Sequence, residues 1–244
     1  MLLAADLALP RLVWAHGYVQ WEGAKMSKTA GTAVSVGAAI ERHGADALRY
    51  FLLREVGFEN DGNFTWERFD ARYLADLADT FGNLASRSLS MVHRYRGGVV
   101  PSPLSGTERG SGGEGALERA GLEAIASYGR AMDAFELQAG AALVIELATR
   151  ANRYVEETAP WKLAKAKRDA ELDQVLVDLV RTVARLAVMS APFIPSKAEQ
   201  LWNSLGAGAD RSLPTVRLGD LPGLAVGGWT VAKPPLLFPK PDAD

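Results

Sequence analysis

The feature that most constrains the fold is a helical spacing of apolar residues that begins after Trp66 and continues to about Leu205. Apolar residues three to five positions apart fall on one face of an α-helix, and that face must be buried against other elements. The first stripe predicts a long amphipathic helix from about Asp70 to Tyr95, and one more helix is expected around Ala198 to Leu205, after Pro192 and Pro195. Because 48% of the 244 residues are hydrophobic, a sizeable core is possible and a helix bundle is expected. The main stripes are Leu74, Leu77, Phe81, Leu84, Leu89 and Val92; Leu143, Leu147 and Tyr154; and Leu172, Val175, Leu176, Leu179, Val180, Val183 and Leu186.

The N-terminal residues follow a different pattern. From Pro10 to Trp21, aromatic, β-branched and aliphatic residues predict strand structure. A glycine-flanked loop follows, and then two short helical patterns, Val36 to Arg42 and Asp46 to Glu55. Asp46 precedes an apolar run and is expected to be the N-cap of the second helix. This part resembles the end of an α/β domain with a small connecting module.

Glycine, serine and proline gather in residues 96–115 and again from residue 206 onward, which predicts an exposed loop and an irregular tail. We therefore predict a mainly α-helical fold in three parts. Residues 1–66 form the N-terminal part, residues 67–205 form the helix bundle, and residues 206–244 form a tail that packs back on the N-terminal part.

Composition narrows the classes of function. The chain has no cysteine, and its three histidines are scattered, so no metal site is expected. Its 27 basic and 29 acidic residues give a net charge of −2, so binding to nucleic acid would need a local basic patch. No basic leader and no run of eighteen apolar residues occurs, which predicts a cytoplasmic protein without a membrane segment.

The segment Lys25-Met26-Ser27-Lys28-Thr29 carries the chemistry most clearly. Two lysines on a glycine-flanked loop can fold over a triphosphate. When the α-phosphate of ATP is attacked, negative charge grows on the departing pyrophosphate, and ammonium groups there stabilise the transition state more than the ground state. Taken alone, two lysines three positions apart are more often a solvated surface loop.

The five residues Lys25 to Thr29 resemble the KMSKS signature of class I aminoacyl-tRNA synthetases, with threonine in place of the final serine. Two further segments resemble the methionyl-tRNA synthetase family: FGNLASR at residues 81–87 and YVEETAPW at residues 154–161. The sequences HGADALRYFLLR at 43–54, DGNF at 61–64 and LFP at 237–239 fit the same family. The resemblance runs from about Leu9 to Pro239.

The resemblance implies a remnant of a Rossmann-like catalytic domain and its connecting module, followed by an anticodon-binding helix bundle. It implies that Lys25 and Lys28 are the catalytic lysines that contact ATP, with Lys28 as the direct phosphate contact. Met26, Ser27 and Thr29 would complete the ATP-binding loop. ATP and methionine would be substrates of the complete enzyme, with magnesium expected there, and the RNA partner would be methionine tRNA.

The resemblance also points to an anticodon site at Asn83, Arg87 and Trp161. Asn83 and Arg87 are four residues apart and therefore share one helical face, where an amide and a guanidinium can read base edges. The indole of Trp161, after Pro160, can stack on an unpaired base of the CAU anticodon. Each residue has a plainer alternative: Asn83 bonded to a neighbouring helix, Arg87 in a surface ion pair, and Trp161 as a core aromatic.

A local basic patch supports binding to RNA. Residues 150–168 contain six basic residues and only two acidic ones, Glu156 and Glu157. Lysines in this patch would hold phosphates without reading sequence. The six basic residues are Arg150, Arg153, Lys162, Lys165, Lys167 and Arg168.

No His-x-Gly-His sequence occurs, although the HIGH signature precedes the lysine loop in class I synthetases. We therefore expect a methionine–tRNA ligase by family that is inactive alone. Three accounts remain open: a fragment of a full ligase, one subunit of a split ligase whose partner chain carries the HIGH half, or a stand-alone tRNA-binding module. A protein-interaction helix bundle without any RNA role is the alternative from another class.

Overall fold

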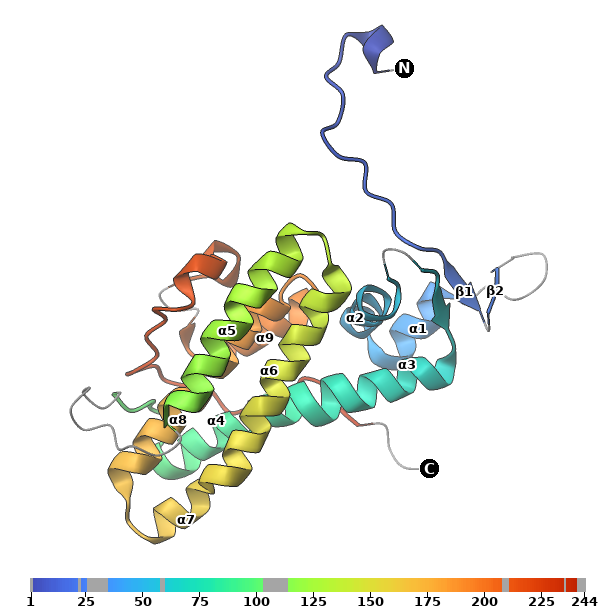
Figure 1. Cartoon of the computed structure of the whole chain (residues 1–244). Coiled ribbons are helices and arrows are strands. Elements are labelled where there is room, and N and C mark those ends of the chain that lie inside the picture. The colour runs from blue at the N-terminus through green and yellow to red at the C-terminus, as the bar shows by residue number, and fades with distance from the viewer. Residues whose placement is uncertain are drawn as a thin grey trace.

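The computed structural model describes residues 2–21, 23–25, 35–57, 60–102, 114–207, 211–234 and 236–240. Helices dominate this part of the chain (Figure 1), which confirms the predicted mainly α-helical fold. The strands are β1 (Val19–Trp21), β2 (Ala24–Lys25) and β3 (Gly62–Phe64). The α-helices are α1 (Val36–His43), α2 (Ala45–Glu55), α3 (Trp66–Arg72), α4 (Asn83–Arg96), α5 (Glu114–Asp133), α6 (Leu137–Thr158), α7 (Pro160–Lys165), α8 (Asp169–Ser190) and α9 (Pro195–Ser204).

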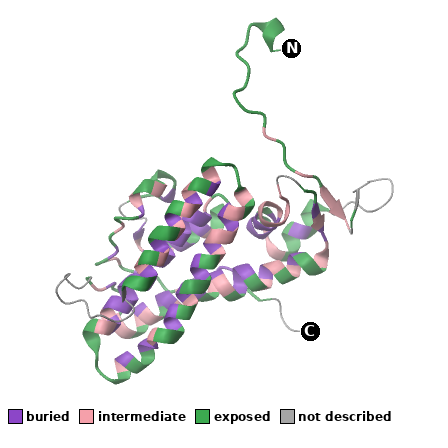
Figure 2. Cartoon of the chain, viewed as in Figure 1, coloured by how far each residue is buried: buried purple, intermediate pink, exposed green. Residues whose placement is uncertain are grey.

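Helix α8 lies at the centre of the bundle and packs against α4, α5, α6, α7 and α9. The apolar stripe predicted from Leu172 to Leu186 is buried along its whole length. Figure 2 shows this buried interior and, by contrast, the exposed N-terminal segment. Burial of apolar surface contributes the main favourable free energy of folding, so the bundle is the stable body to which the other segments attach.

The N-terminal part holds a small three-stranded sheet in the order β2-β1-β3. Strand β1 pairs antiparallel with β2 and parallel with β3, with Trp21 opposite Phe64 in the parallel pair. The prediction of strand structure from Pro10 was wrong for the residues before Val19. A strand needs a neighbour for its backbone groups, and the segment before β1 is extended and exposed, with the Val13 side chain 82% exposed.

The predicted long helix from Asp70 to Tyr95 is confirmed, but its middle is not α-helical. Between α3 and α4 the chain forms a π-helix over Tyr73–Gly82. The hydroxyl of Thr80 donates to the carbonyl of Ala75 at 2.7 Å, five residues earlier. A Cβ at Gly82 would lie 3.0 Å from the carbonyl oxygen of Leu77 and 3.5 Å from the Phe238 ring, so this position favours glycine. Such π-helical stretches are rare and often lie next to functional residues.

The predicted N-cap role of Asp46 was wrong. Gly44 is the N-cap of α2, and Asp46 lies in the first turn of that helix. Its carboxylate instead accepts a hydrogen bond from the backbone N–H of Lys197, in the first turn of α9. Asp46 therefore caps a helix of the bundle from the N-terminal part, an arrangement that local sequence cannot reveal.

The C-terminal tail runs along the helical part. Thr230 forms an isolated antiparallel bridge with Val99. Near its end, Phe238 packs edge-on against Tyr73 and Phe81, and the Tyr73 hydroxyl donates to the Pro239 carbonyl at 2.7 Å. These tail contacts are all with residues of the helical part that follow Trp66, while packing of the tail on residues 1–66 stays a prediction.

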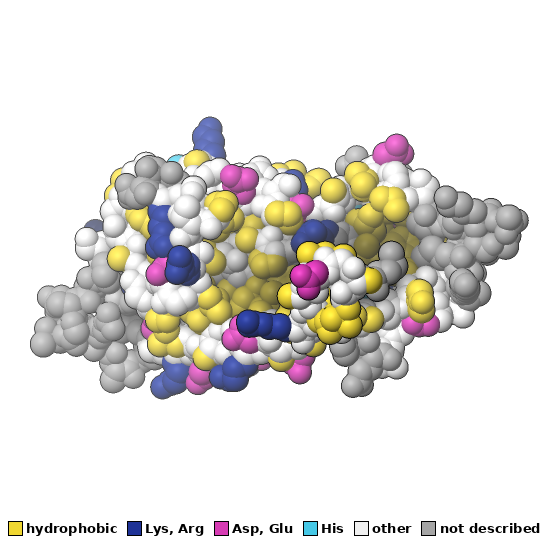
Figure 3. All heavy atoms as spheres, turned by 90° about the horizontal axis from the view of Figure 1, so that it is seen from above, with side chains coloured by type: hydrophobic (Ala, Val, Ile, Leu, Met, Phe, Trp, Pro, Cys, Tyr) yellow, Lys and Arg dark blue, Asp and Glu magenta, His cyan; other side chains and the backbone are white. Residues whose placement is uncertain are grey.

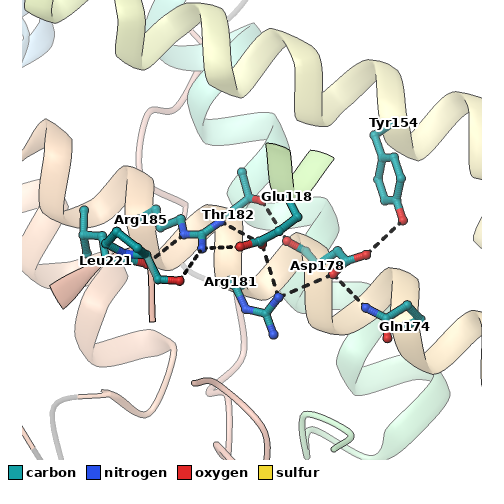
Figure 4. A network of polar contacts seen from close by, with 9 residues as sticks. Glu118, Tyr154, Gln174, Asp178, Arg181, Thr182, Arg185 and Leu221 are labelled. Carbon is teal, nitrogen blue, oxygen red and sulfur yellow. Dashed lines mark hydrogen bonds and ion pairs between the residues drawn. The ribbon is translucent and has the colours of Figure 1, made fainter. Parts of the chain in front are cut away.

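A buried polar network joins the bundle to the tail (Figure 4). The guanidinium of Arg185 on α8 is fully buried and donates to both carboxylate oxygens of Glu118 on α5, at 2.7 and 2.9 Å. It also donates to the backbone carbonyls of Leu221 and Pro222 in the tail. Because every donor group of a buried guanidinium needs an acceptor, Arg185 fixes α5 and the tail relative to α8.

Candidate nucleic-acid interface

Two helices present a ladder of polar side chains where α4 and α6 meet. The side-chain amide of Asn83 lies 3.4 Å from the Oδ1 atom of Asn152, and the guanidinium of Arg87 lies 2.6 Å from the carboxylate of Glu156. From the first pair to the second, each helix advances by four residues, so α4 and α6 run in the same direction at this contact. Asn83 is exposed, and the Arg87 side chain is 32% exposed.

Trp161 stands just beyond the end of this ladder. Ala159 adopts a left-handed conformation with φ of 44°, which ends α6, and Pro160 begins α7. The fixed φ of proline suits the first position of a helix. Trp161 follows in the first turn of α7 and is 42% exposed, so it is not a core aromatic.

The structure thus places Asn83 and Arg87 in one row and Trp161 in the turn that follows the Glu156 end of that row. The two plainer alternatives for Asn83 and Arg87 are also observed, because each contacts a neighbouring helix. These contacts do not remove either group from the surface. The side chain of Glu156 is 60% exposed, and an ion pair at such a site is worth only about 0–1 kcal/mol, so Arg87 can exchange it for another anion.

The basic patch is smaller than the sequence suggested. Arg150 pairs with Glu146, Arg153 with Glu157, and Arg168 with Glu171. Two of these three acidic partners lie outside the segment 150–168, so counting within it missed them. For Lys162, Lys165 and Lys167 no ion pair is recorded in the part of the chain that the structure describes. These three exposed lysines, on α7 and directly after it, are the cations available to a polyanion.

Sequence reasoning missed Asn152 and Glu156, which face the two predicted residues from α6. A signal for them was present, because their spacing of four residues repeats the spacing of Asn83 and Arg87. Only the contact between α4 and α6 in the structure could show that the two pairs of residues face each other.

The lysine loop falls largely outside the described residues. Lys25 is the last residue of β2, where its backbone pairs with Gln20. Met26, Ser27, Lys28 and Thr29 lie outside the described part, so the predicted ATP-binding arrangement stays a prediction.

A cavity of about 650 Å³ lies at the opposite end of the bundle, between the α5–α6 corner and the N-terminal part. Figure 3 looks down on this face and shows hydrophobic side chains gathered in its hollow. Trp14, Leu52, Leu53, Phe135 and Leu137 are among its lining residues. None of the predicted site residues lines this cavity.

The described residues contain no group of three histidine, aspartate or glutamate side chains that could hold a metal ion. Within the same ranges, no helix combines the length and the apolar character needed to cross a membrane.

Comparison with known proteins gives first the class and then the family. Residues 1–89 match the family model described as tRNA synthetases class I (M), which places this stretch, including the start of α4, in the class I aminoacyl-tRNA synthetases. Residues 104–244 match the model described as the anticodon binding domain of methionyl tRNA ligase. The chain belongs to the methionyl-tRNA ligase family.

Individual relatives agree with this assignment. The methionine–tRNA ligase of Oceanobacillus iheyensis is 37% identical over 247 residues, covering 100% of this chain and 36% of the relative. That of Bacillus subtilis is 38% identical over 216 residues, covering 87% of this chain and 32% of the relative. The crystal structure of Mycobacterium tuberculosis methionyl-tRNA synthetase bound by methionyl-adenylate superposes with a TM-score of 0.85 at 31% identity, over 98% of this chain and 46% of that chain. The chain therefore spans about a third of the length of these curated relatives.

Proposed function

We propose that this chain is the part of a methionine–tRNA ligase that binds the anticodon of methionine tRNA, through the surface formed by α4, α6 and α7. The observation that carries the proposal is the polar ladder of Asn83 and Arg87 beside the exposed indole of Trp161. An amide, a guanidinium and an aromatic face are the groups that read unpaired bases.

The roles divide by chemistry. Trp161 stacks on one splayed base, while Asn83 and Arg87 bind base edges from the same helical face. Lys162, Lys165 and Lys167 neutralise phosphates, which gives affinity without sequence information. RNA must exchange the Arg87–Glu156 pair for its own contact, which costs little because that pair is exposed.

The test is a binding titration of this chain with an RNA hairpin that carries the CAU anticodon loop. Because a base stacked on an aromatic side chain contributes about 1–3 kcal/mol, Trp161→Ala should weaken binding by about tenfold or more. Phe135→Ala is the matched control, because Phe135 is similarly exposed, at 47%, and lies just before the start of α6. Helix α6 has 22 residues and is about 33 Å long, so Phe135 is far from Trp161, which follows the end of this helix.

Equal affinities of the unchanged protein and Trp161→Ala for the hairpin would contradict the proposed role of the indole. If the unchanged protein does not bind the hairpin at all, a protein-interaction bundle becomes the better account. A hairpin with a different anticodon should bind more weakly, because only base-edge contacts depend on sequence.

We further propose that the segment Lys25 to Thr29 is the ATP-side loop of the complete enzyme. Lys25 and Lys28 would stabilise the charge that develops on the pyrophosphate during methionyl-adenylate formation, with magnesium as a counter-ion of the nucleotide. In a complete ligase that contains this segment, Lys28→Ala should lower the rate of ATP–pyrophosphate exchange. An unchanged rate would contradict the assignment.

The same exchange reaction distinguishes two of the three accounts of this chain, the split ligase and the stand-alone module. If a separate partner chain carries the HIGH half, mixing the two chains should restore exchange. A stand-alone tRNA-binding module would bind the hairpin and give no exchange in any mixture.

A further inference from the structure

The structure points to Asn152 as a positioning residue that fixes the orientation of the Asn83 amide. We propose that Asn152 turns the Asn83 carbonyl oxygen toward the RNA, so that Asn83 selects an unpaired cytosine or adenine, the bases with an amine at C4 or C6. This inference rests on the proposed function and adds the chemical class of base that one contact accepts.

The orientation of Asn152 follows from its neighbours. Its Nδ2 atom donates to the backbone carbonyl of Thr80 at 2.9 Å and to that of Ala148 at 3.1 Å. Both neighbours are acceptors only, so they must face the NH₂ group of the amide rather than its oxygen. The two hydrogens of Nδ2 are then both used, and Oδ1 is left facing α4.

The orientation of Asn83 follows in turn. The Oδ1 atom of Asn152 can only accept, so Asn83 must turn its own Nδ2 toward it, across 3.4 Å. The carbonyl oxygen of the exposed Asn83 amide then faces away from Asn152 and can accept a hydrogen bond from a ligand. Without Asn152, either end of the amide can face the RNA at nearly equal cost.

Thr80 ties this arrangement to the unusual helix that precedes it. The Thr80 carbonyl belongs to the last turn of the π-helix Tyr73–Gly82, directly before Asn83. Asn152 therefore bonds both the side chain of Asn83 and the backbone turn that carries Asn83. One α6 residue thus sets where the amide lies and which way it faces.

An outward acceptor discriminates among bases. Cytosine and adenine present an exocyclic amine at their base-pairing edges, whereas uracil and guanine present a carbonyl oxygen at the equivalent position. An amine satisfies the Asn83 oxygen, and a carbonyl would oppose it with a second acceptor. Leaving a polar group without a partner in a contact from which water is excluded is costly, so the oxygen favours cytosine and adenine at this position.

The test compares hairpins of the CAU loop in which the cytosine is replaced by uracil, or the adenine by a purine that lacks the amine. The unchanged protein should discriminate against one of these replacements by about tenfold. Asn152→Ala should lose most of that discrimination, and so should Asn83→Ala. In the double variant, Asn152→Ala should have no further effect, because the residue acts through Asn83. Ser204→Ala, which removes a comparable side-chain-to-carbonyl bond within α9, is the control and should keep the discrimination.

A spectroscopic measurement tests the orientation without RNA. The NMR signals of the Asn83 side-chain NH₂ group, identified by their loss in Asn83→Ala, should move in Asn152→Ala and stay in place in Ser204→Ala.

The results that would contradict the role of Asn152 differ from the result that would contradict the proposed function. The assignment is overturned if Asn152→Ala weakens binding to all hairpins equally while the preference persists, because that is the effect of a structural residue. It is also overturned if the Asn83 signals do not move, or if Asn152→Ala costs the same with and without Asn83. If the unchanged protein binds no hairpin, the proposed function fails and the selection role fails with it, whatever the NMR signals show.

Discussion

The carboxylate of Asp46 in α2 accepts a hydrogen bond of 2.7 Å from the backbone N–H of Lys197 in α9, 151 residues later in the chain. The bond satisfies one of the free N–H groups at the start of α9, and the negative charge lies at the positive end of the helix dipole. The N-terminal part is thereby fastened to the bundle. Asp46→Ala should lower the free energy of unfolding by about 1–2 kcal/mol in urea titrations.

The matched variant is Asp46→Asn, which keeps an acceptor oxygen and should lose much less stability than Asp46→Ala. Equal losses in the two variants would mean that the hydrogen bond to α9 contributes nothing.

The buried pair of Arg185 and Glu118 gives a second prediction. Glu118→Ala would leave the guanidinium of Arg185 in the core with only the two carbonyls of the tail, which should cost about 3 kcal/mol or more. Combining Glu118→Ala with Arg185→Met should recover part of that loss, because the uncompensated charge is then gone. Unfolding titrations of the two single variants and the double variant measure the coupling, and purely additive losses would contradict it.

The carboxyl group of Asp178 should make stability depend on pH. Burial raises the pKa of Asp178 to about 6, against the hydrogen bond from Gln174 and the charge of Arg181, which lower it. The folded state therefore takes up the proton at a higher pH than the unfolded chain does, and stability increases as the pH falls through 6. Between pH 7 and pH 5, this group should add about 1 kcal/mol to the free energy of unfolding.

The measurement is the difference in unfolding free energy between the unchanged protein and Asp178→Asn at several pH values. That difference should shift in favour of the unchanged protein as the pH is lowered from 7 to 5. A constant difference over this range would show that Asp178 does not titrate there.

Lys167 links stability to RNA binding. It follows Ala166, the C-cap of α7, and adopts a left-handed conformation with φ of 55°. Its N–H donates to the Ala164 carbonyl, and the N–H of Arg168 donates to the Leu163 carbonyl. This is the helix-ending motif in which glycine is favoured, because a side chain costs about 1 kcal/mol there. Lys167→Gly should therefore raise the free energy of unfolding by up to about 1 kcal/mol, while weakening binding to the RNA hairpin.

Two readouts separate these effects. The slope of the logarithm of affinity against the logarithm of salt concentration should decrease by about 1 in Lys167→Gly, as expected for one lost phosphate contact. Asn is also tolerated in the left-handed region, so Lys167→Asn should behave similarly. Unchanged hairpin affinity and salt slope in both variants would remove Lys167 from the interface.

The bundle was predictable from the sequence because its signal is local and repeated. The stripe from Leu172 to Leu186 is buried as expected, and the long helix through Phe81 and Leu89 forms. The π-helix within it could not be read from the spacing of the apolar residues, and neither could the proximity of Gly82 to Phe238, 156 residues later in the chain. The strand expected before Val19 failed for the related reason that a strand depends on neighbours elsewhere in the chain.

The candidate site was predictable only in part. A family resemblance and a spacing of four residues singled out Asn83 and Arg87, and an exposed Trp161 agrees with the proposed role. Their partners Asn152 and Glu156 lie on α6, and each is 69 residues later in the chain than the residue it contacts. No local pattern links them. The size of the basic patch was overestimated because Glu146 and Glu171 lie just outside the segment. Each forms an ion pair with an arginine inside the segment, one helical turn away.

The length of the π-helix Tyr73–Gly82 also determines which side of α4 faces α6. In an α-helix each residue turns the next by about 100°, so removing a single residue from this stretch would rotate the whole of α4 about its axis. Asn83 and Arg87 would leave the α6 contact and face a different side of the molecule, although their identities and their mutual spacing were intact. The number of residues in this stretch, more than their identity, therefore determines which side chains α4 presents at the surface.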